Sequence, residues 1–234
     1  MTGGLYRWPE AAWFGRVVPK AKFYEHGTVP TAVREKFVAD VQRITWAYKL
    51  AENTINLSGT IAVPEIQVFQ IDAKGTDVSE SVLAAIDKAV KTPIIFEIIT
   101  QGDAPARRTR MVAAHKAPST VTAKLGSYHS TEWFQHDAER QPLPTAIDLP
   151  ALYARLIESL TSLTARPGED ATEIAARLES IRKLEREVAA LERKLRSEPQ
   201  LNRKVEIRRT LKSKQAALAA LISPSPGPAP GVQN

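Results

Sequence analysis

Three residues near the middle of the chain could form part of a metal-dependent nuclease site. Asp72, Ala73 and Lys74 match the acid-x-lysine pattern of restriction-type nucleases, at the end of a predicted strand. Such a site needs a second carboxylate on a neighbouring strand, because divalent metal ions require several oxygen ligands. Glu97 on the next predicted strand could supply it. The pattern is short, and Asp72 close to Gly75 also suits a strand exit, so the nuclease is kept as an alternative hypothesis.

The rest of the sequence offers little that is typical of a catalytic centre. The chain has no cysteine, which excludes disulfides and thiolate chemistry. Its four histidines lack the regular spacing of metal ligands, and there is no glycine-rich phosphate loop. We therefore assign no catalytic residue, expect no metal and no cofactor, and favour a protein that is not an enzyme.

A basic cluster near the C-terminus is the stronger candidate for a binding surface. Between positions 201 and 222 the chain carries six lysines and arginines but a single acidic residue, Glu206. Such a cluster could bind the phosphates of a nucleic acid or an acidic surface on a protein. The alternative is a solvent-exposed helix face that binds nothing. The four residues assigned to partner or nucleic-acid binding are Arg203, Lys204, Arg208 and Arg209.

The basic cluster lies on a predicted helical hairpin. From Ala171 onward, apolar residues recur in a heptad pattern, which is typical of a coiled coil. Arg177 interrupts the apolar seam, and Pro199 interrupts the helix, because proline is poorly tolerated in a helix interior. We therefore predict two antiparallel helices with a tight reversal at Pro199, which would begin the second helix.

The sequence before the hairpin predicts an α+β fold, in which helices flank a mixed β-sheet. A β–α–β unit over 65–99 is expected to pair its two strands in parallel, because a helix joins them. The other predicted elements are a helix at 31–42, strands at 43–50, 109–116 and 121–130, and a helix that starts after its cap Asp148.

Length and composition fit one globular domain with an appendage. The chain has 234 residues, of which 43% are hydrophobic. Proline-rich segments mark the predicted boundaries. We predict a globular domain at 1–165, the helical hairpin or coiled coil at 166–222, and a disordered proline-rich tail at 223–234.

The net charge of +6 is mildly basic, so it permits binding to nucleic acid or to an acidic partner without requiring either. The N-terminus lacks the apolar core of a signal peptide, and no apolar run is long enough to span a bilayer. We expect a cytoplasmic protein that does not associate with membranes.

An ordered series of motifs resembles an uncharacterised bacterial and archaeal family, catalogued only as a domain of unknown function. The resemblance covers roughly 5–222. The motifs are LYRWPEAAWFGRVVPKAKFYEH, RITWAYKLAENTINL, VPEIQVFQI, AIDKAVKTPIIFEI and LNRKVE.

The resemblance implies a small companion protein, encoded near DNA methyltransferases and Swi/Snf-type helicases in restriction or phage-defence clusters. It implies no catalytic residues. We therefore expect a non-enzymatic accessory subunit of a DNA-directed defence or restriction-modification-like complex, which docks through its hairpin on a helicase or methyltransferase. The alternatives are a metal-dependent nuclease using Asp72, Lys74 and Glu97, and a protein that binds nucleic acid through the basic arm of the hairpin.

Overall fold

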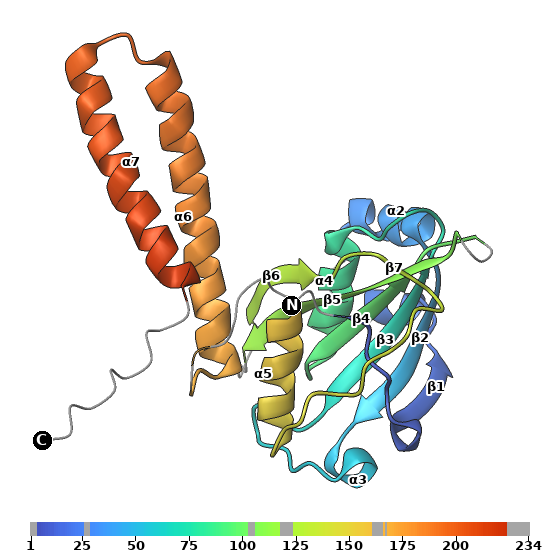
Figure 1. The fold of residues 1–234 in the computed structure, drawn as a ribbon. Helices are drawn as coiled ribbons and strands as arrows, with labels where there is room; N and C mark the ends of the chain where they lie inside the picture. The colour runs from blue at the N-terminus through green and yellow to red at the C-terminus, as the bar shows by residue number, and fades with distance from the viewer. Residues whose placement is uncertain are drawn as a thin grey trace, which may run out of the picture. The chain divides into compact units, whose positions relative to one another are not determined.

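The computed structural model divides the chain into two units, Met1–Ser162 and Leu163–Asn234. It describes residues 4–25, 29–102, 106–117, 124–160, 166 and 168–223. The predicted boundary at 165 and the predicted tail beyond Ser223 lie outside these residues. The first unit contains a β-sheet with helices, and the second contains two long helices (Figure 1).

The described strands of the first unit form one seven-stranded sheet, which agrees with the predicted mixed sheet. Its order is β1-β2-β3-β4-β5-β6, with β7 also paired to β5. All neighbours are antiparallel except β3 and β4. The strands are β1 (Trp13–Val17), β2 (Val41–Leu50), β3 (Ile66–Ala73), β4 (Ile94–Ile99), β5 (Arg108–Ala117), β6 (Lys124–Ser130) and β7 (Phe134–Gln135).

The β3–α4–β4 unit is the predicted parallel crossover. Helix α4 (Glu80–Ala89) joins the two strands, and Phe69 of β3 lies opposite Phe96 of β4. Both strands are buried on both faces, which explains their nearly continuous apolar sequences. This unit therefore forms the centre of the sheet and brings the carboxyl ends of β3 and β4 to the same edge.

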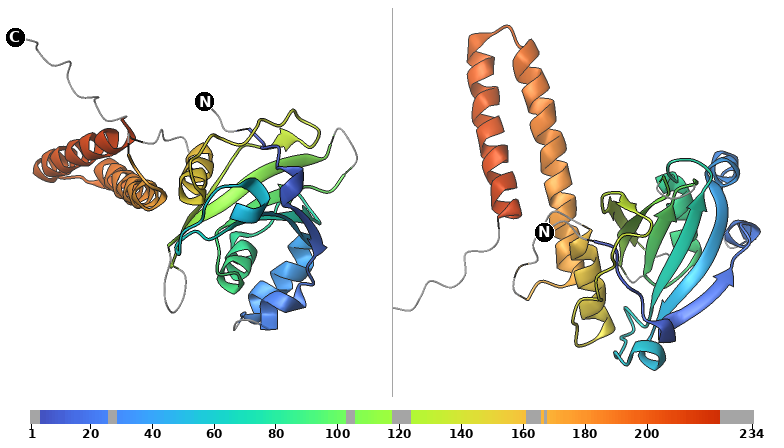
Figure 2. Two further views of the ribbon diagram at one scale, coloured as in Figure 1. Left: turned by 90° about the horizontal axis from the view of Figure 1, so that it is seen from below. Right: turned by 45° about the vertical axis from the view of Figure 1, so that its right-hand side comes forward.

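One face of the sheet packs against three helices (Figure 2). These are α1 (Ala21–Glu25), α2 (Thr31–Asp40) and α4. Phe37 of α2 and Ile86 of α4 are fully buried in this core, together with Phe96 of β4. Burial of these side chains is the main driving force for packing this layer.

The opposite face is covered by α5 (Leu149–Ser159) and by the N-terminal segment (Figure 2). Asp148 caps α5 as predicted, because its Oδ1 accepts a hydrogen bond of 2.7 Å from the Ala151 amide. The Tyr153 hydroxyl of α5 donates to the Ala114 carbonyl of β5. The short helices η1 (Glu10–Ala12), a 3-10 helix, and α3 (Glu52–Ile55) complete the first unit.

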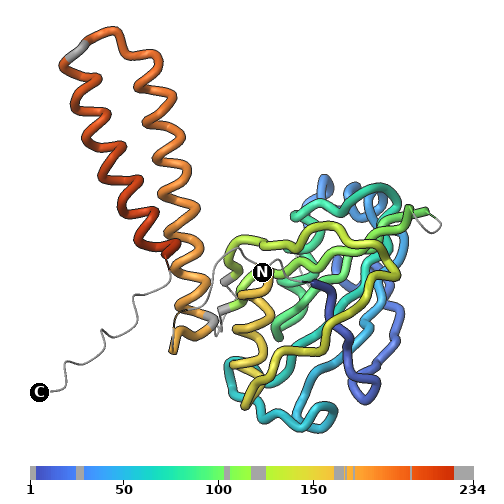
Figure 3. The backbone as a smooth tube through the Cα atoms, in the orientation of Figure 1, coloured from blue at the N-terminus to red at the C-terminus, as the bar shows by residue number. Residues whose placement is uncertain are grey.

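The second unit is an antiparallel hairpin of two packed helices, α6 (Ala171–Ser197) and α7 (Leu201–Ile222) (Figure 3). The hairpin was predicted from the heptad pattern and is confirmed. Pro199 lies in the three-residue connection between Ser197 and Leu201 and not at the start of α7. The proline thus separates the two helices without removing a hydrogen bond from either one.

Strand β1 was missed by the sequence analysis. Its pairing with β2 shifts register between Trp13 and Arg16, and Gly15 has a positive φ of 65°. A Cβ at Gly15 would lie 2.7 Å from the Trp13 indole nitrogen, but that side chain is 56% exposed and free to shift, so the backbone conformation is what favours glycine here. This bulge breaks the alternation by which an edge strand is normally recognised.

Candidate functional site

Glu97, the predicted second carboxylate, is fully buried in β4 and bound by protein groups. Its Oε1 accepts hydrogen bonds from Arg140 Nη1 at 2.6 Å and from Trp8 Nε1 at 2.7 Å. Its Oε2 accepts one from Gln70 Nε2 at 3.0 Å. Arg140 also donates to the Tyr6 carbonyl at 2.8 Å. Glu97 therefore ties the N-terminal segment and the segment around Arg140 to the centre of the sheet.

Asp72 lies at the end of β3, between two arginines. Its Oδ2 is 2.7 Å from Arg43 Nε, and its Oδ1 is 3.4 Å from Arg107 Nη2. Strand alternation places Asp72 on the same face as Gln70, which contacts Glu97. The two acids thus share a face of the sheet, but each is paired with arginine.

Lys74 lies apart from both acids. Its Nζ donates a hydrogen bond of 2.7 Å to the Val38 carbonyl in α2. The acid-x-lysine pattern therefore does not bring its lysine toward Asp72 through any contact among the described residues. Across all the residues that the structure describes, no group of three or more acidic or histidine side chains is arranged to hold a metal ion.

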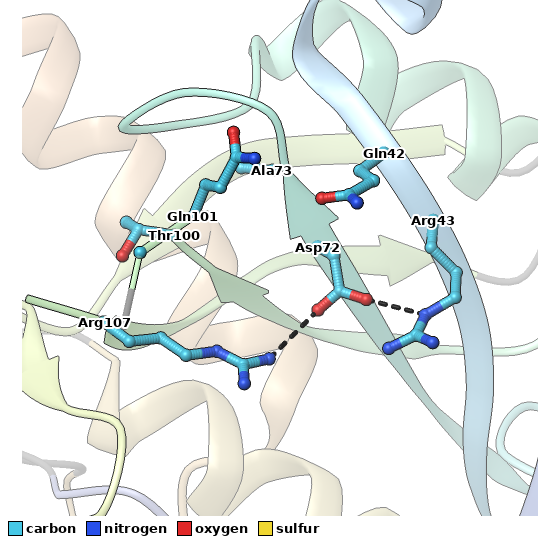
Figure 4. Close-up of a pocket in the computed structure, with 8 residues that line it drawn as sticks. Gln42, Arg43, Asp72, Ala73, Thr100, Gln101 and Arg107 are labelled. Atoms are coloured by element: carbon cyan, nitrogen blue, oxygen red, sulfur yellow. Dashed lines mark hydrogen bonds and ion pairs between the residues drawn. The ribbon is translucent and has the colours of Figure 1, made fainter. Parts of the chain in front are cut away.

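A pocket of about 730 Å³ opens beside Asp72, at the carboxyl ends of β3 and β4 (Figure 4). Asp72 and Ala73 of the lining come from β3, and Thr100 and Gln101 come from the segment that follows β4. The lining is Gln42, Arg43, Asp72, Ala73, Thr100, Gln101, Gly102 and Arg107. Sequence reasoning found Asp72 but not its two arginines, because the partners lie 29 and 35 positions away in the chain.

A buried polar cluster in the first unit was also missed. Lys116 Nζ is 2.9 Å from Asp87 Oδ1, and both side chains are at most 2% exposed. Lys116 also donates to the carbonyls of Asp87, Val90 and Thr92, at the C-terminal end of α4. The Tyr128 hydroxyl donates to Asp87 Oδ2 at 2.5 Å.

Burial raises the pKa of Asp87, while Lys116 and Tyr128 oppose that shift. Burial likewise lowers the pKa of Lys116, and the charge of Asp87 opposes that shift. The pKa of Tyr128 is raised by burial and by the negative charge of Asp87. One signal for this cluster was present in the sequence: Asp87 follows Leu83 by four residues, so it lies on the apolar side of α4.

The predicted binding residues of the hairpin lie on α7, mostly toward solvent. Arg203, Arg208 and Arg209 are exposed, whereas Lys204 is half-buried. Lys204 follows the spacing of the apolar residues that face α6, including Ile207 and Leu211. Among the described residues, none of the four basic side chains forms a hydrogen bond or ion pair, and Val205 between them is 58% exposed.

At the open end of the hairpin, Arg177 binds the end of α7. Its Nε and Nη2 contact the two carboxylate oxygens of Glu169 at 2.7 and 2.6 Å, and its Nη1 donates to the Leu221 carbonyl at 3.1 Å. Arg166 donates to the Ala220 carbonyl at 2.7 Å. Arginine at helix C-terminal carbonyls satisfies acceptors that the helix itself leaves unpaired. Arg177, which interrupts the apolar seam of α6, therefore caps the C-terminal end of α7.

The fold and sites define a mixed α+β domain followed by a helical hairpin. Residues 7–218 match the model of one family, so the chain belongs to the family described as a domain of unknown function (DUF4391). No curated protein and no solved structure matches the chain. Among the described residues, no helix combines the length and apolar character needed to cross a membrane.

Proposed function

We propose that the protein is a non-enzymatic accessory subunit that docks on a larger protein through its hairpin. The observation that carries this proposal is the set of exposed basic side chains on α7, which have no partner among the described residues. Val205 adds an exposed apolar side chain within the same turns. A helix face of this composition suits a partner surface that combines carboxylates with apolar groups.

The placement of the nuclease candidates supports a non-enzymatic role. Glu97 is buried and bound by Arg140, Trp8 and Gln70, so its oxygens are already occupied by protein donors. Lys74 contacts the Val38 carbonyl, away from the acids. Binding a metal at Glu97 would require breaking buried hydrogen bonds to a carboxylate, which is costly.

The proposed partner is a helicase or DNA methyltransferase encoded beside this protein, in a DNA-directed defence or restriction-modification-like complex. This assignment rests on the family resemblance of the sequence motifs. Localisation in the cytoplasm follows from the same proposal.

Co-purification of the full chain with these neighbours tests the proposal. The variant Arg203→Glu/Arg208→Glu/Arg209→Glu reverses three exposed charges on α7, and it leaves the half-buried Lys204 intact. The matched control, Lys183→Glu/Arg186→Glu/Arg193→Glu, makes the same change in charge at exposed positions of α6. We expect the α7 variant to lose its partner and the α6 variant to retain it. Retention by both variants, or equal loss from both, would contradict docking through α7.

A further inference from the structure

The pocket at the carboxyl ends of β3 and β4 contains more hydrogen-bond donors than Asp72 uses. Arg43 donates to Asp72 through Nε, and Arg107 donates through Nη2. A guanidinium has five N–H donors, so most donors of both arginines remain uncommitted among the described residues. In Figure 4 the remaining guanidinium nitrogens of both arginines lie on the same side of the Asp72 carboxylate. Asp72 therefore orients the two arginines while it leaves several of their N–H donors available to a ligand.

The charge of the pocket favours an anion. Two arginines against one aspartate leave a net charge of +1 among the ionised lining residues. Asp72 is 18% exposed, and Arg43 and Arg107 are 57% and 37% exposed, so the guanidinium groups are accessible from the pocket. Arginine binds phosphate well, because its planar group can donate two parallel hydrogen bonds to phosphate oxygens.

The size and neutral lining of the pocket indicate that the anion carries an organic group. A volume of about 730 Å³ is within the range of small-molecule sites and exceeds the need of a bare phosphate. Gln42 and Gln101 add side-chain amides, each of which can both donate and accept hydrogen bonds, as the edges of nucleobases also do. The pocket opens at the carboxyl ends of the two parallel strands β3 and β4.

We propose that this pocket binds one phosphate group of a nucleotide or a single nucleic-acid strand. Arg43 and Arg107 donate to the phosphate oxygens, and Asp72 acts as a positioning residue that holds one guanidinium group on each side of its carboxylate. The single net positive charge matches a phosphodiester, which carries one negative charge. This proposal does not depend on docking by the hairpin, because every residue involved belongs to the first unit.

The test is a titration of the full-length protein, followed by calorimetry, with inorganic phosphate, a nucleoside 5′-monophosphate and a single-stranded octanucleotide. We compare the wild type with Arg43→Gln and Arg107→Gln. Arg108→Gln is the matched control, because Arg108 is exposed, adjacent in sequence and absent from the pocket lining. Each pocket variant should lose about tenfold in affinity or more, as expected for a charge-assisted hydrogen bond. The control should bind like the wild type.

Comparison of the three ligands distinguishes a nucleotide from a nucleic-acid strand as the source of the phosphate. Binding of the mononucleotide as tight as that of the octanucleotide indicates a nucleotide site, whereas binding of the octanucleotide alone indicates a strand. If the octanucleotide alone binds, the double variant Arg43→Gln/Arg107→Gln should reduce the log–log salt slope by about 0.7, the value for one phosphate of a single strand. The substitution Arg43→Lys keeps the charge but loses the planar guanidinium group that can donate two parallel hydrogen bonds. Its affinity should therefore lie between those of Arg43→Gln and the wild type. Absence of binding to all three ligands, or equal losses in Arg108→Gln, would overturn the proposal.

Discussion

Lys116 shows how a single residue can link three elements in the first unit. Its ammonium group pairs with Asp87 and also donates to three carbonyls at the end of α4. The backbone amide of Lys116 donates to the Tyr153 hydroxyl of α5 at 3.1 Å. Strand β5 is thus joined to a helix on each face of the sheet. A buried charge of this kind is tolerated only while its partners remain in place.

The substitution Lys116→Met should destabilise the first unit by about 3–5 kcal/mol, because it leaves the buried Asp87 carboxylate without its cation. Adding Asp87→Asn removes that charge and keeps an acceptor for Tyr128, so the double variant should be more stable than Lys116→Met alone. Urea unfolding followed by tryptophan fluorescence measures this, since all four tryptophans lie in Met1–Ser162. Equal stability of the single and double variants would show that the charge of Asp87 is not the cause.

Side-chain partners are the part of the site that the sequence could not provide. Asp72 was identified because an acid at a strand end is visible from spacing alone. Arg140 was not, because it lies 43 positions from Glu97 and meets it only after the chain has crossed the sheet. Ser79 is a residue type that favours capping and it precedes α4, but its hydroxyl donates to Asp40 Oδ2 at 2.6 Å and not to the helix. Such contacts depend on tertiary packing, which can override a local preference.

At the scale of elements, periodicity predicted most of the fold. The transition from helix to strand near 42 occurs at Val41, and the parallel pairing of β3 with β4 was predicted from the helix between them. Strand β1 escaped because the bulge at Gly15 interrupts its alternation. The heptad pattern predicted α6 and α7, but it could not explain Arg177, whose acceptor at Leu221 belongs to the other helix.

The contact between Glu169 and Arg177 should make the hairpin sensitive to acid. Burial acts to raise the pKa of Glu169, but hydrogen bonds from Arg177 and Arg166 and their charges outweigh it, so the pKa is lowered. Because the pKa of Glu169 is lower in the folded state than its ordinary value of 4.5, the ionised carboxylate stabilises the fold at pH values above 4.5. This stabilisation is lost as the pH falls through the folded-state pKa.

Glu169→Gln should therefore lower the midpoint of thermal unfolding of the hairpin at pH 7. The difference from the wild type should shrink below pH 4.5, as Glu169 of the wild type becomes protonated. The measurement is helical circular dichroism, with tryptophan fluorescence as a separate report on the first unit. Glu185→Gln serves as the control, because Glu185 is exposed on α6. A difference that does not shrink as the pH is lowered below 4.5, or a similar effect of the control, would argue against the Glu169–Arg177 contact.

At the scale of the whole molecule, the two units differ in composition as well as in fold. The second unit contains no aromatic residue, whereas the first contains all fifteen, counted as six Phe, four Trp and five Tyr. Aromatic side chains usually anchor interfaces and stack on nucleobases. Docking by the hairpin, as proposed above, would therefore depend on charge and aliphatic contacts, which suits a charged protein surface better than single-stranded nucleic acid.

The salt dependence of DNA binding by the full chain separates protein docking from phosphate contact at the hairpin. If Arg203, Arg208 and Arg209 contacted duplex phosphates, the log–log slope would include a contribution of about −3. We expect instead that Arg203→Glu/Arg208→Glu/Arg209→Glu leaves the slope for DNA unchanged while it abolishes capture of the protein partner. Each exposed ion pair with a protein would contribute only about 0–1 kcal/mol, so the expected loss of capture rests also on the like-charge repulsion that the three glutamates would introduce against an acidic partner.

The same titration also distinguishes the hairpin from the pocket. Residual DNA affinity that disappears in Arg43→Gln/Arg107→Gln, but not in the hairpin variant, would assign phosphate binding to the first unit and docking to the second. A steep slope that only the hairpin substitutions flatten would reverse this assignment and make α7 a nucleic-acid surface. Because each variant alters residues of one unit only, the effect of each can be attributed to that unit.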